Sequence, residues 1–175
     1  MAFGNLFKKK KPEISKELYG ERVLSRILLK CAEKSPDLFD ELGIKMEFTH
    51  YLLYIEYLLF LAEKIMAQRY SASTIRVIAD CTIDGLVDYM DIVPTPQKGN
   101  CKRLLHQMYQ EVRSYSEEIC TDISSKRGLK NLSEAFLKDC GGEKELVGDL
   151  LVFTDFTGFI IYHTSDILND EITIV

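Results

Sequence analysis

One stretch of the chain, YLLYIEYLLFLA at residues 51–62, is apolar or aromatic at every position except Glu56. The stretch is too short to cross a bilayer as a helix, because a span needs about 20 apolar residues. We predict that it lies within a long helix over residues 45–69. A helix that is apolar around most of its circumference must be surrounded by other elements. This stretch therefore predicts a helical bundle with residues 45–69 at its centre.

Further helices are predicted wherever apolar residues recur at spacings of three and four, the period of one helix face. We expect them over residues 15–33, 36–42, 74–90, 101–126 and 132–140. Ser35 and Ser73 stand where N-caps belong, and Gly43, Gly128 and Gly141 stand where helices end. The packed seam of the 101–126 helix is predicted to be Leu105, Met108, Val112, Tyr115 and Ile119.

Residues 143–168 fit two structures. Their apolar spacing suits a helix, whereas the aromatic and β-branched residues suit a short hairpin near residues 150–163, with its turn at Asp155–Gly158. We favour the helix, because a lone hairpin is barely stable. The expected fold is an all-α single-domain bundle of five to seven helices over residues 13–168. A head at residues 1–12 and a tail at residues 169–175 flank it.

The charge of the chain is unevenly distributed. The net charge is −5, but residues 1–12 carry four lysines and no acid, which leaves −9 on the rest. An acidic body argues against nucleic-acid binding, which needs a basic face. The five cysteines form no C-x-x-C pair, so we expect no disulfide framework or zinc site. We expect five small buried thiols in a reducing cytoplasm.

The head offers one candidate site. Its apolar residues could share a helix face next to the lysines, which would give a weak membrane-surface anchor. The residues of this alternative are Phe3, Leu6, Phe7, Lys8, Lys9, Lys10 and Lys11. The simpler interpretation is a solvated terminus.

An acidic stripe offers a second candidate site. Asp80, Asp84 and Asp88 repeat every four residues, and Asp91 follows. Like charges at this spacing destabilise a helix by a few tenths of a kcal/mol per pair. Arg76 can relieve only the first aspartate, so an external basic partner or a cation would explain the stripe. A plain solvated face is the simpler explanation.

The three histidines offer a third candidate site. His50, His106 and His163 lie on different predicted helices, and Glu47 precedes His50 as Glu-x-x-His. Three imidazoles could hold one divalent metal ion, although the second Glu-x-x-His pair of a di-iron bundle is missing.

Glu56 is ambiguous. If buried, it would have a raised pKa and could serve as an acid or base. We favour a solvated stripe with Thr49 and Glu63, because the three lie seven residues apart.

No nucleotide-binding, hydrolase or metalloprotease motif occurs in the chain. We therefore expect a non-catalytic protein without a cofactor, which binds a basic protein partner through Asp80, Asp84, Asp88 and Asp91. An immunity or antitoxin-type protein, or an adaptor, is the concrete form of this hypothesis. The alternatives are a metal- or small-ligand-binding bundle and a peripheral membrane adaptor. A homo-oligomer is compatible with each of them.

Overall fold

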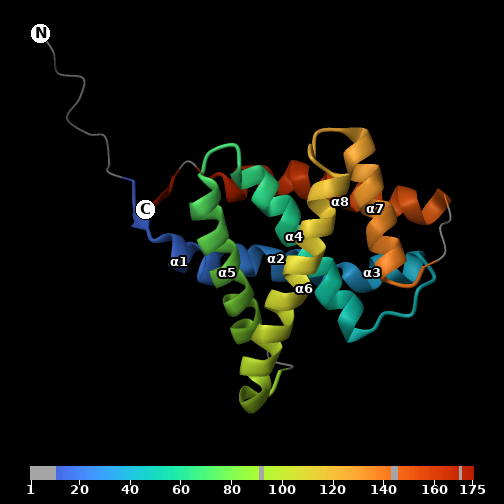
Figure 1. Ribbon diagram of the computed structural model, residues 1–175, viewed down its shortest axis with the longest axis horizontal. Helices are drawn as coiled ribbons and strands as arrows, with labels where there is room; N and C mark the ends of the chain where they lie inside the picture. Colours follow the sequence, from blue (N-terminus) through green and yellow to red (C-terminus); the bar gives the residue numbers. More distant parts are fainter. Residues whose placement is uncertain (1–10, 91–92, 143–145, 170) are drawn as a thin grey trace, which may run out of the picture.

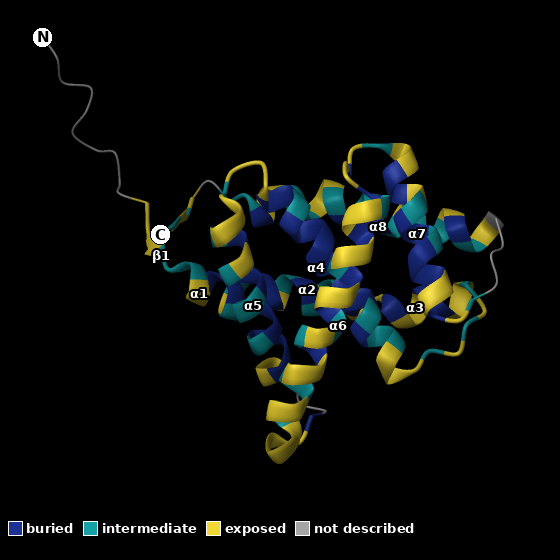
Figure 2. Ribbon diagram, in the orientation of Figure 1, coloured by how far each residue is buried: buried dark blue, intermediate teal, exposed yellow. Residues whose placement is uncertain are grey.

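The computed structural model describes residues 11–90, 93–142, 146–169 and 171–175, and it confirms the all-α bundle (Figure 1). Its elements are β1 Glu13–Ile14, α1 Lys16–Leu18, η1 Tyr19–Leu24, α2 Ser25–Ala32, α3 Ser35–Glu41, α4 Phe48–Met66, α5 Ala72–Tyr89, η2 Thr95–Gln97, α6 Lys98–Ile119, α7 Lys126–Asp139, α8 Leu146–Ile167 and β2 Thr173–Ile174. As predicted, α4 is central. It packs against α2, α5, α6, α7 and α8, and most of its length is buried (Figure 2).

Aromatic rings fill the space between α4, α7 and α8. The Phe136 ring lies 5.3 Å from that of Tyr57 and 5.8 Å from those of Tyr54 and Phe156, centroid to centroid. Each buried tyrosine also needs a partner for its hydroxyl. Tyr57 donates to Asp139 on α7 at 2.7 Å, and Tyr54 donates to Asp155 on α8. These contacts connect the central helix to both of its neighbours.

The first helical segment contains a π-helical turn, η1, between α1 and α2. Here the backbone crosses α5 at very short range. A Cβ atom added at Gly20 would lie 2.4 Å from the carbonyl oxygen of Ile78, and one added at Gly85 would lie 2.3 Å from that of Glu21. Real Cβ atoms do not approach other atoms so closely, so both positions require glycine. The sequence did not reveal this crossing, because neither glycine marks a turn.

The segment at residues 146–167 is one continuous helix, so the hairpin alternative is wrong. Val152, Phe156 and Phe159 lie on its buried side, where they pack into the bundle. Burial on this side outweighs the strand preference of its aromatic and β-branched residues, which depends strongly on context.

Several predicted helix ends are corrected. The helix that begins before Cys101 ends at Ile119, and Lys126 and Arg127 begin α7 instead of closing α6. The N-cap of α5 is Ser71, not Ser73. Ser35 is no N-cap, since its hydroxyl donates back to the carbonyl of Ala32 at 2.7 Å. The helix ends at Gly43 and Gly141 are confirmed, with φ of 67° and 70°.

The ends of the described chain meet in a short parallel pair of strands (Figure 1). The Thr173 N–H donates to Pro12 O at 3.0 Å, and the Val175 N–H donates to Ile14 O at 3.0 Å. Ile14 and Ile174 pack against the core. The described residues of the tail are therefore joined to the segment that precedes α1.

Candidate interaction surfaces

The aspartate stripe of α5 faces a histidine and a lysine of α6. His106 Nε2 lies 3.3 Å from Asp84 Oδ1, and Lys102 Nζ lies 2.9 Å from Asp88 Oδ2. His106 Nδ1 also lies 3.8 Å from Asp80 Oδ1. The lysine and the histidine are four residues apart on α6, so they match the four-residue spacing of the aspartates on the adjacent helix. Asp91 lies outside the described residues.

We call these facing pairs, Asp80, Asp84 and Asp88 on α5 with Lys102 and His106 on α6, the aspartate ladder. The ladder explains the aspartates within the fold, because their partners lie on the neighbouring helix and not on their own. The sequence signal was present as Lys98, Lys102 and His106 at i, i+4 and i+8. Both sides of the ladder are partly exposed, so each pair contributes no more than about 1 kcal/mol.

We expect Lys102→Glu to lower the free energy of unfolding by about 0.5 to 1 kcal/mol in dilute buffer. The substitution replaces the ammonium group beside Asp88 with a second carboxylate. The loss should shrink at high salt, since exposed charges are screened. Urea denaturation at low and high salt measures it, with Arg103→Glu, an exposed position of the same helix, as the matched control. A loss that is independent of salt would mean that the ladder does not act electrostatically.

The structure does not bring the three histidines together. The His50 ring stacks on Phe39 at 5.6 Å, and its Nδ1 accepts from the backbone N–H of Glu47 at 3.2 Å. The Glu-x-x-His pattern therefore caps the N-terminus of α4, with Glu47 as the N-cap residue. His163 lies 3.2 Å from Asp166 and 3.2 Å from Cys31 Sγ. Across the described ranges, no group of three or more histidine, cysteine, aspartate or glutamate residues could hold a metal ion.

Glu56 and Glu63 are buried, so the solvated stripe was wrong for both of them, whereas Thr49 is exposed. Both face α6 rather than water. Glu63 pairs with Arg113 through a contact of 2.9 Å, whereas neither carboxylate oxygen of Glu56 has a hydrogen-bond partner among the described residues. Burial raises the pKa of Glu56 well above its ordinary value, and it raises that of Glu63 against the opposing pull of Arg113.

The cysteine prediction holds only in part. All five thiols are free, but only Cys120 and Cys140 are buried. Burial raises the pKa of Cys140 to about 12 and that of Cys31 to about 11, so both thiols stay protonated at neutral pH.

The candidate membrane-surface site falls largely outside the described residues. Residues 1–10 are not described, and Lys11 is exposed. None of the helices that the structure describes is both long and apolar enough to traverse a membrane.

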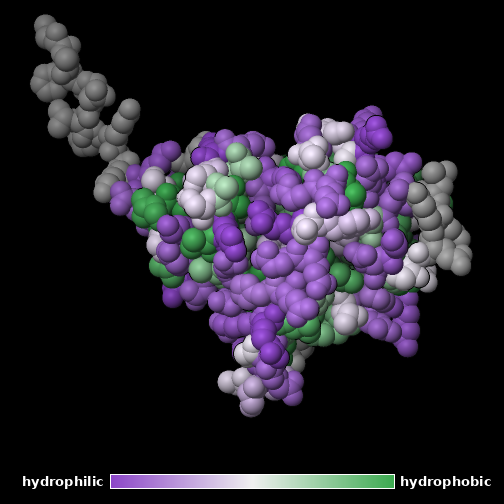
Figure 3. Space-filling view, viewed as in Figure 1, coloured by the Kyte–Doolittle hydropathy of each residue, from purple (hydrophilic) through white to green (hydrophobic). Residues whose placement is uncertain are grey.

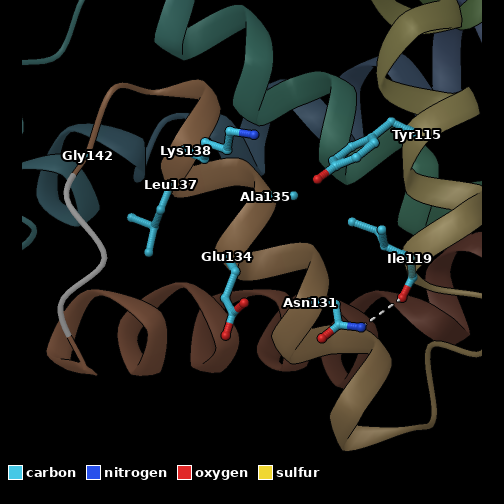
Figure 4. Close-up of a pocket in the computed structure, with 8 residues that line it drawn as sticks. All are labelled: Tyr115, Ile119, Asn131, Glu134, Ala135, Leu137, Lys138 and Gly142. Atoms are coloured by element: carbon cyan, nitrogen blue, oxygen red, sulfur yellow. Dashed lines mark hydrogen bonds between the residues drawn. The ribbon is translucent and has the colours of Figure 1, made fainter.

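A groove lies between α6 and α7. It consists of two pockets, of about 350 and 440 Å³, that share Tyr115 and Lys138. Tyr115 extends from α6 toward α7, and the Asn131 amide donates to Ile119 O at 3.3 Å, which joins α7 to the last turn of α6 (Figure 4). Tyr115 belongs to the predicted packed seam, yet it is 42% exposed. Leu105 and Val112 of that seam are buried as expected.

The floor of the groove is apolar and its rim is mostly acidic. The apolar lining residues are Leu53, Met108, Val112, Ile119, Ala135 and Leu137. The rim carries three carboxylates, at Glu111, Glu134 and Asp139, against one ammonium group at Lys138. Of these carboxylates, Glu134 also lies 3.8 Å from Lys130 of its own helix. Asp139 is held in place by the hydroxyl of the buried Tyr57. Hydrophobic areas between hydrophilic side chains are visible on this side of the molecule (Figure 3).

Sequence reasoning missed the α7 side of this groove. Lys138 and Asp139 stand in the last turn of this helix. Its predicted range, residues 132–140, gave no indication of which helix it faces. Another, mainly apolar pocket of about 590 Å³ lies between the start of α4 and the α5–α6 connection. Its lining residues include Phe48, Leu52, Cys101 and Leu104.

Comparisons of this chain with protein-family models, curated proteins and solved structures yield no match.

Proposed function

We propose that the protein binds a basic segment of another protein in the groove between α6 and α7. The observation that carries this proposal is the pairing of an apolar floor with a rim on which Glu111 and Asp139 lie with a single lysine, Lys138. The aspartate ladder supports it less well, because Lys102 and His106 already face those carboxylates. The proposal keeps the basic partner expected from the sequence and moves its binding site.

The groove suits an amphipathic segment. Met108 and Tyr115 offer adaptable and aromatic contact area, the side-chain types enriched at the centres of protein interfaces. Lysine or arginine side chains of the partner would meet Glu111 and Asp139 at the rim, which favours fast encounter and correct orientation. An immunity or antitoxin-type protein that neutralises a basic effector would use such a groove.

The test uses the full chain and a fluorescein-labelled peptide with leucines at helical spacing and lysines elsewhere. We expect saturable binding by fluorescence anisotropy, and no binding of the same peptide with glutamate at every lysine. Glu111→Lys and Tyr115→Ala should each weaken binding by about tenfold, since each removes roughly 1.4 kcal/mol of contact or charge complementarity.

Glu41→Lys is the matched control, because Glu41 is an exposed acid at the end of α3 outside the groove. It should leave binding within about twofold of wild type. A further variant with Asp80, Asp84 and Asp88 all replaced by asparagine separates the two acidic surfaces. If that variant loses binding while Glu111→Lys retains it, the ladder is the binding site and the groove assignment is wrong.

A further inference from the structure

The outer face of α8 is apolar, although its inner face already supplies core residues. Val147, Leu150, Ile161 and Tyr162 are 63%, 62%, 67% and 75% exposed. Val147, Leu150, Thr154 and Ile161 follow a 3-4-7 spacing, so they form one stripe along the helix. Exposed apolar residues that stand singly are ordinary, but a stripe of them along one helix indicates an interaction surface.

This stripe carries no charge. From Val147 to Ser165, none of the exposed side chains of α8 is ionisable except the phenol of Tyr162, in a chain with 28% charged residues. The two carboxylates in this part of the helix are turned inward: Asp149 is buried, and Asp155 accepts from Tyr54. The Thr154 hydroxyl is used by its own helix, since it donates to Leu150 O at 2.8 Å. Thr154 therefore adds a methyl group to the stripe rather than an unpaired polar group.

The stripe is complementary to itself when it is reversed. Leu150 and Gly158 lie four residues on either side of Thr154, and Val147 and Ile161 lie seven residues on either side. A twofold axis at Thr154 would therefore set each large Leu150 against the Gly158 of a second copy. In a twofold interface, each contact between two residues occurs twice in this way.

Gly158 is not explained by the packing of its own chain. A Cβ atom added there would meet only the Tyr162 ring, at an ordinary distance of 3.9 Å. Glycine inside a helix is less favourable than alanine. Close approach of another helix accounts for a small residue at this half-buried place.

We propose that a second copy of this chain docks on the outer face of α8, with the two helices antiparallel and crossing at Thr154. The absence of charge suits this occupant, because two copies of a chain with a net charge of −5 would otherwise place like charges in contact. A lipid surface fits less well, since the stripe lacks the lysine and arginine residues that hold a helix on anionic lipid.

The available area sets the strength of this dimer. The stripe from Val147 to Ile161 covers 15 residues of α8, or about 22 Å of helix. A strip of this length buries less than the ~800 Å² per partner of a standard interface. We therefore expect a dimer that dissociates in the micromolar range.

Sedimentation equilibrium of the full chain tests the dimer. We expect wild type to pass from monomer to dimer over micromolar concentrations. Leu150→Glu should raise the dissociation constant by at least about tenfold, because it buries like charges in the interface. Leu104→Glu is the matched control, since Leu104 is 50% exposed on α6 outside the stripe, and it should leave dimerisation unchanged. A wild-type chain that stays monomeric throughout, or a dimer that Leu150→Glu does not weaken, overturns the proposal.

Cysteine cross-linking tests the direction of the helices. With oxidised glutathione as the oxidant, Thr154→Cys should give a disulfide-linked dimer, because position 154 meets itself at the twofold axis. Ser165→Cys should not, because an antiparallel partner places the two positions far apart. Wild type reports any linkage through the native thiols. Equal cross-linking at both positions would indicate parallel helices, and a monomer that floats with neutral phosphatidylcholine vesicles would assign the stripe to lipid; either result contradicts the proposal.

Discussion

Glu56→Leu is expected to raise the free energy of unfolding at neutral pH by about 2 to 3 kcal/mol. Glu56 is fully buried, and both of its carboxylate oxygens lack a hydrogen-bond partner among the described residues. Burying such a group is unfavourable whether it stays charged or takes up a proton. Leucine has a similar size and no polar atom, so it removes this cost without leaving a large cavity.

The gain should depend on pH. Burial raises the pKa of Glu56 in the folded state above its ordinary value of 4.5. The folded chain therefore binds a proton that the unfolded chain releases, and stability falls as the pH rises from about 4.5 through the folded-state pKa. The fall approaches about 1.4 kcal/mol per pH unit for one such group. Glu56→Gln and Glu56→Leu should lack this component.

Urea denaturation from about pH 5 to about pH 9 measures the difference between wild type and each variant. Glu63→Gln is the matched control on the same helix. It leaves Arg113 without its carboxylate, so we expect it to destabilise the protein rather than stabilise it. If Glu56→Leu is less stable than wild type across this range, Glu56 has a partner in solution and the assignment of an unpaired buried carboxyl is wrong.

Gly85→Ala is expected to destabilise the protein by about 3 kcal/mol or more. The added Cβ atom would lie 2.3 Å from the carbonyl oxygen of Glu21 and 2.9 Å from its Cα. These are backbone atoms, so no side chain can rotate out of the way. Either η1 must move off α5 or the π-helical turn must rearrange. Gly20→Ala meets Ile78 O in the same way and should have a similar effect.

Thermal denaturation followed by circular dichroism measures these losses. Gly99→Ala is the matched control, because Gly99 lies in α6 and a Cβ atom there would meet nothing within 4 Å. Alanine is the better helix former, so Gly99→Ala should leave the melting temperature unchanged or slightly higher. If Gly85→Ala melts like Gly99→Ala, η1 and α5 do not cross as closely as described.

The fold was predictable from the sequence because it depends on periodic apolar burial. The run at residues 51–62 is sufficient to place α4 at the centre, and Gly43 and Gly141 mark real helix ends. The glycine crossing was not predictable, because it depends on which helices meet and at what distance. Glu56 was misjudged for a related reason. A helical wheel places it with Glu63, but only the position of α6 decides whether that side is covered.

The candidate surfaces were less predictable than the fold. The aspartate stripe was recognised, but its meaning depends on Lys102 and His106, which are distant in sequence and adjacent in space. Tyr115 matches the spacing of a core position and instead lines an open groove. The outer face of α8 escaped notice because a helix that is apolar on both sides resembles a fully buried one. Sequence patterns report which side chains share a face, and tertiary packing decides whether that face is covered.

The strand pair β1–β2 has a consequence for the order in which the chain gains and loses structure. The pair joins residues near opposite ends of the chain. Closing so long a loop therefore has a larger entropic cost than any other contact described. The pair rests on few hydrogen bonds. The pair should therefore form after the helices have assembled and separate before they melt. In native-state hydrogen exchange, the amide protons of Thr173 and Val175 should exchange through a local opening, well ahead of those in α4.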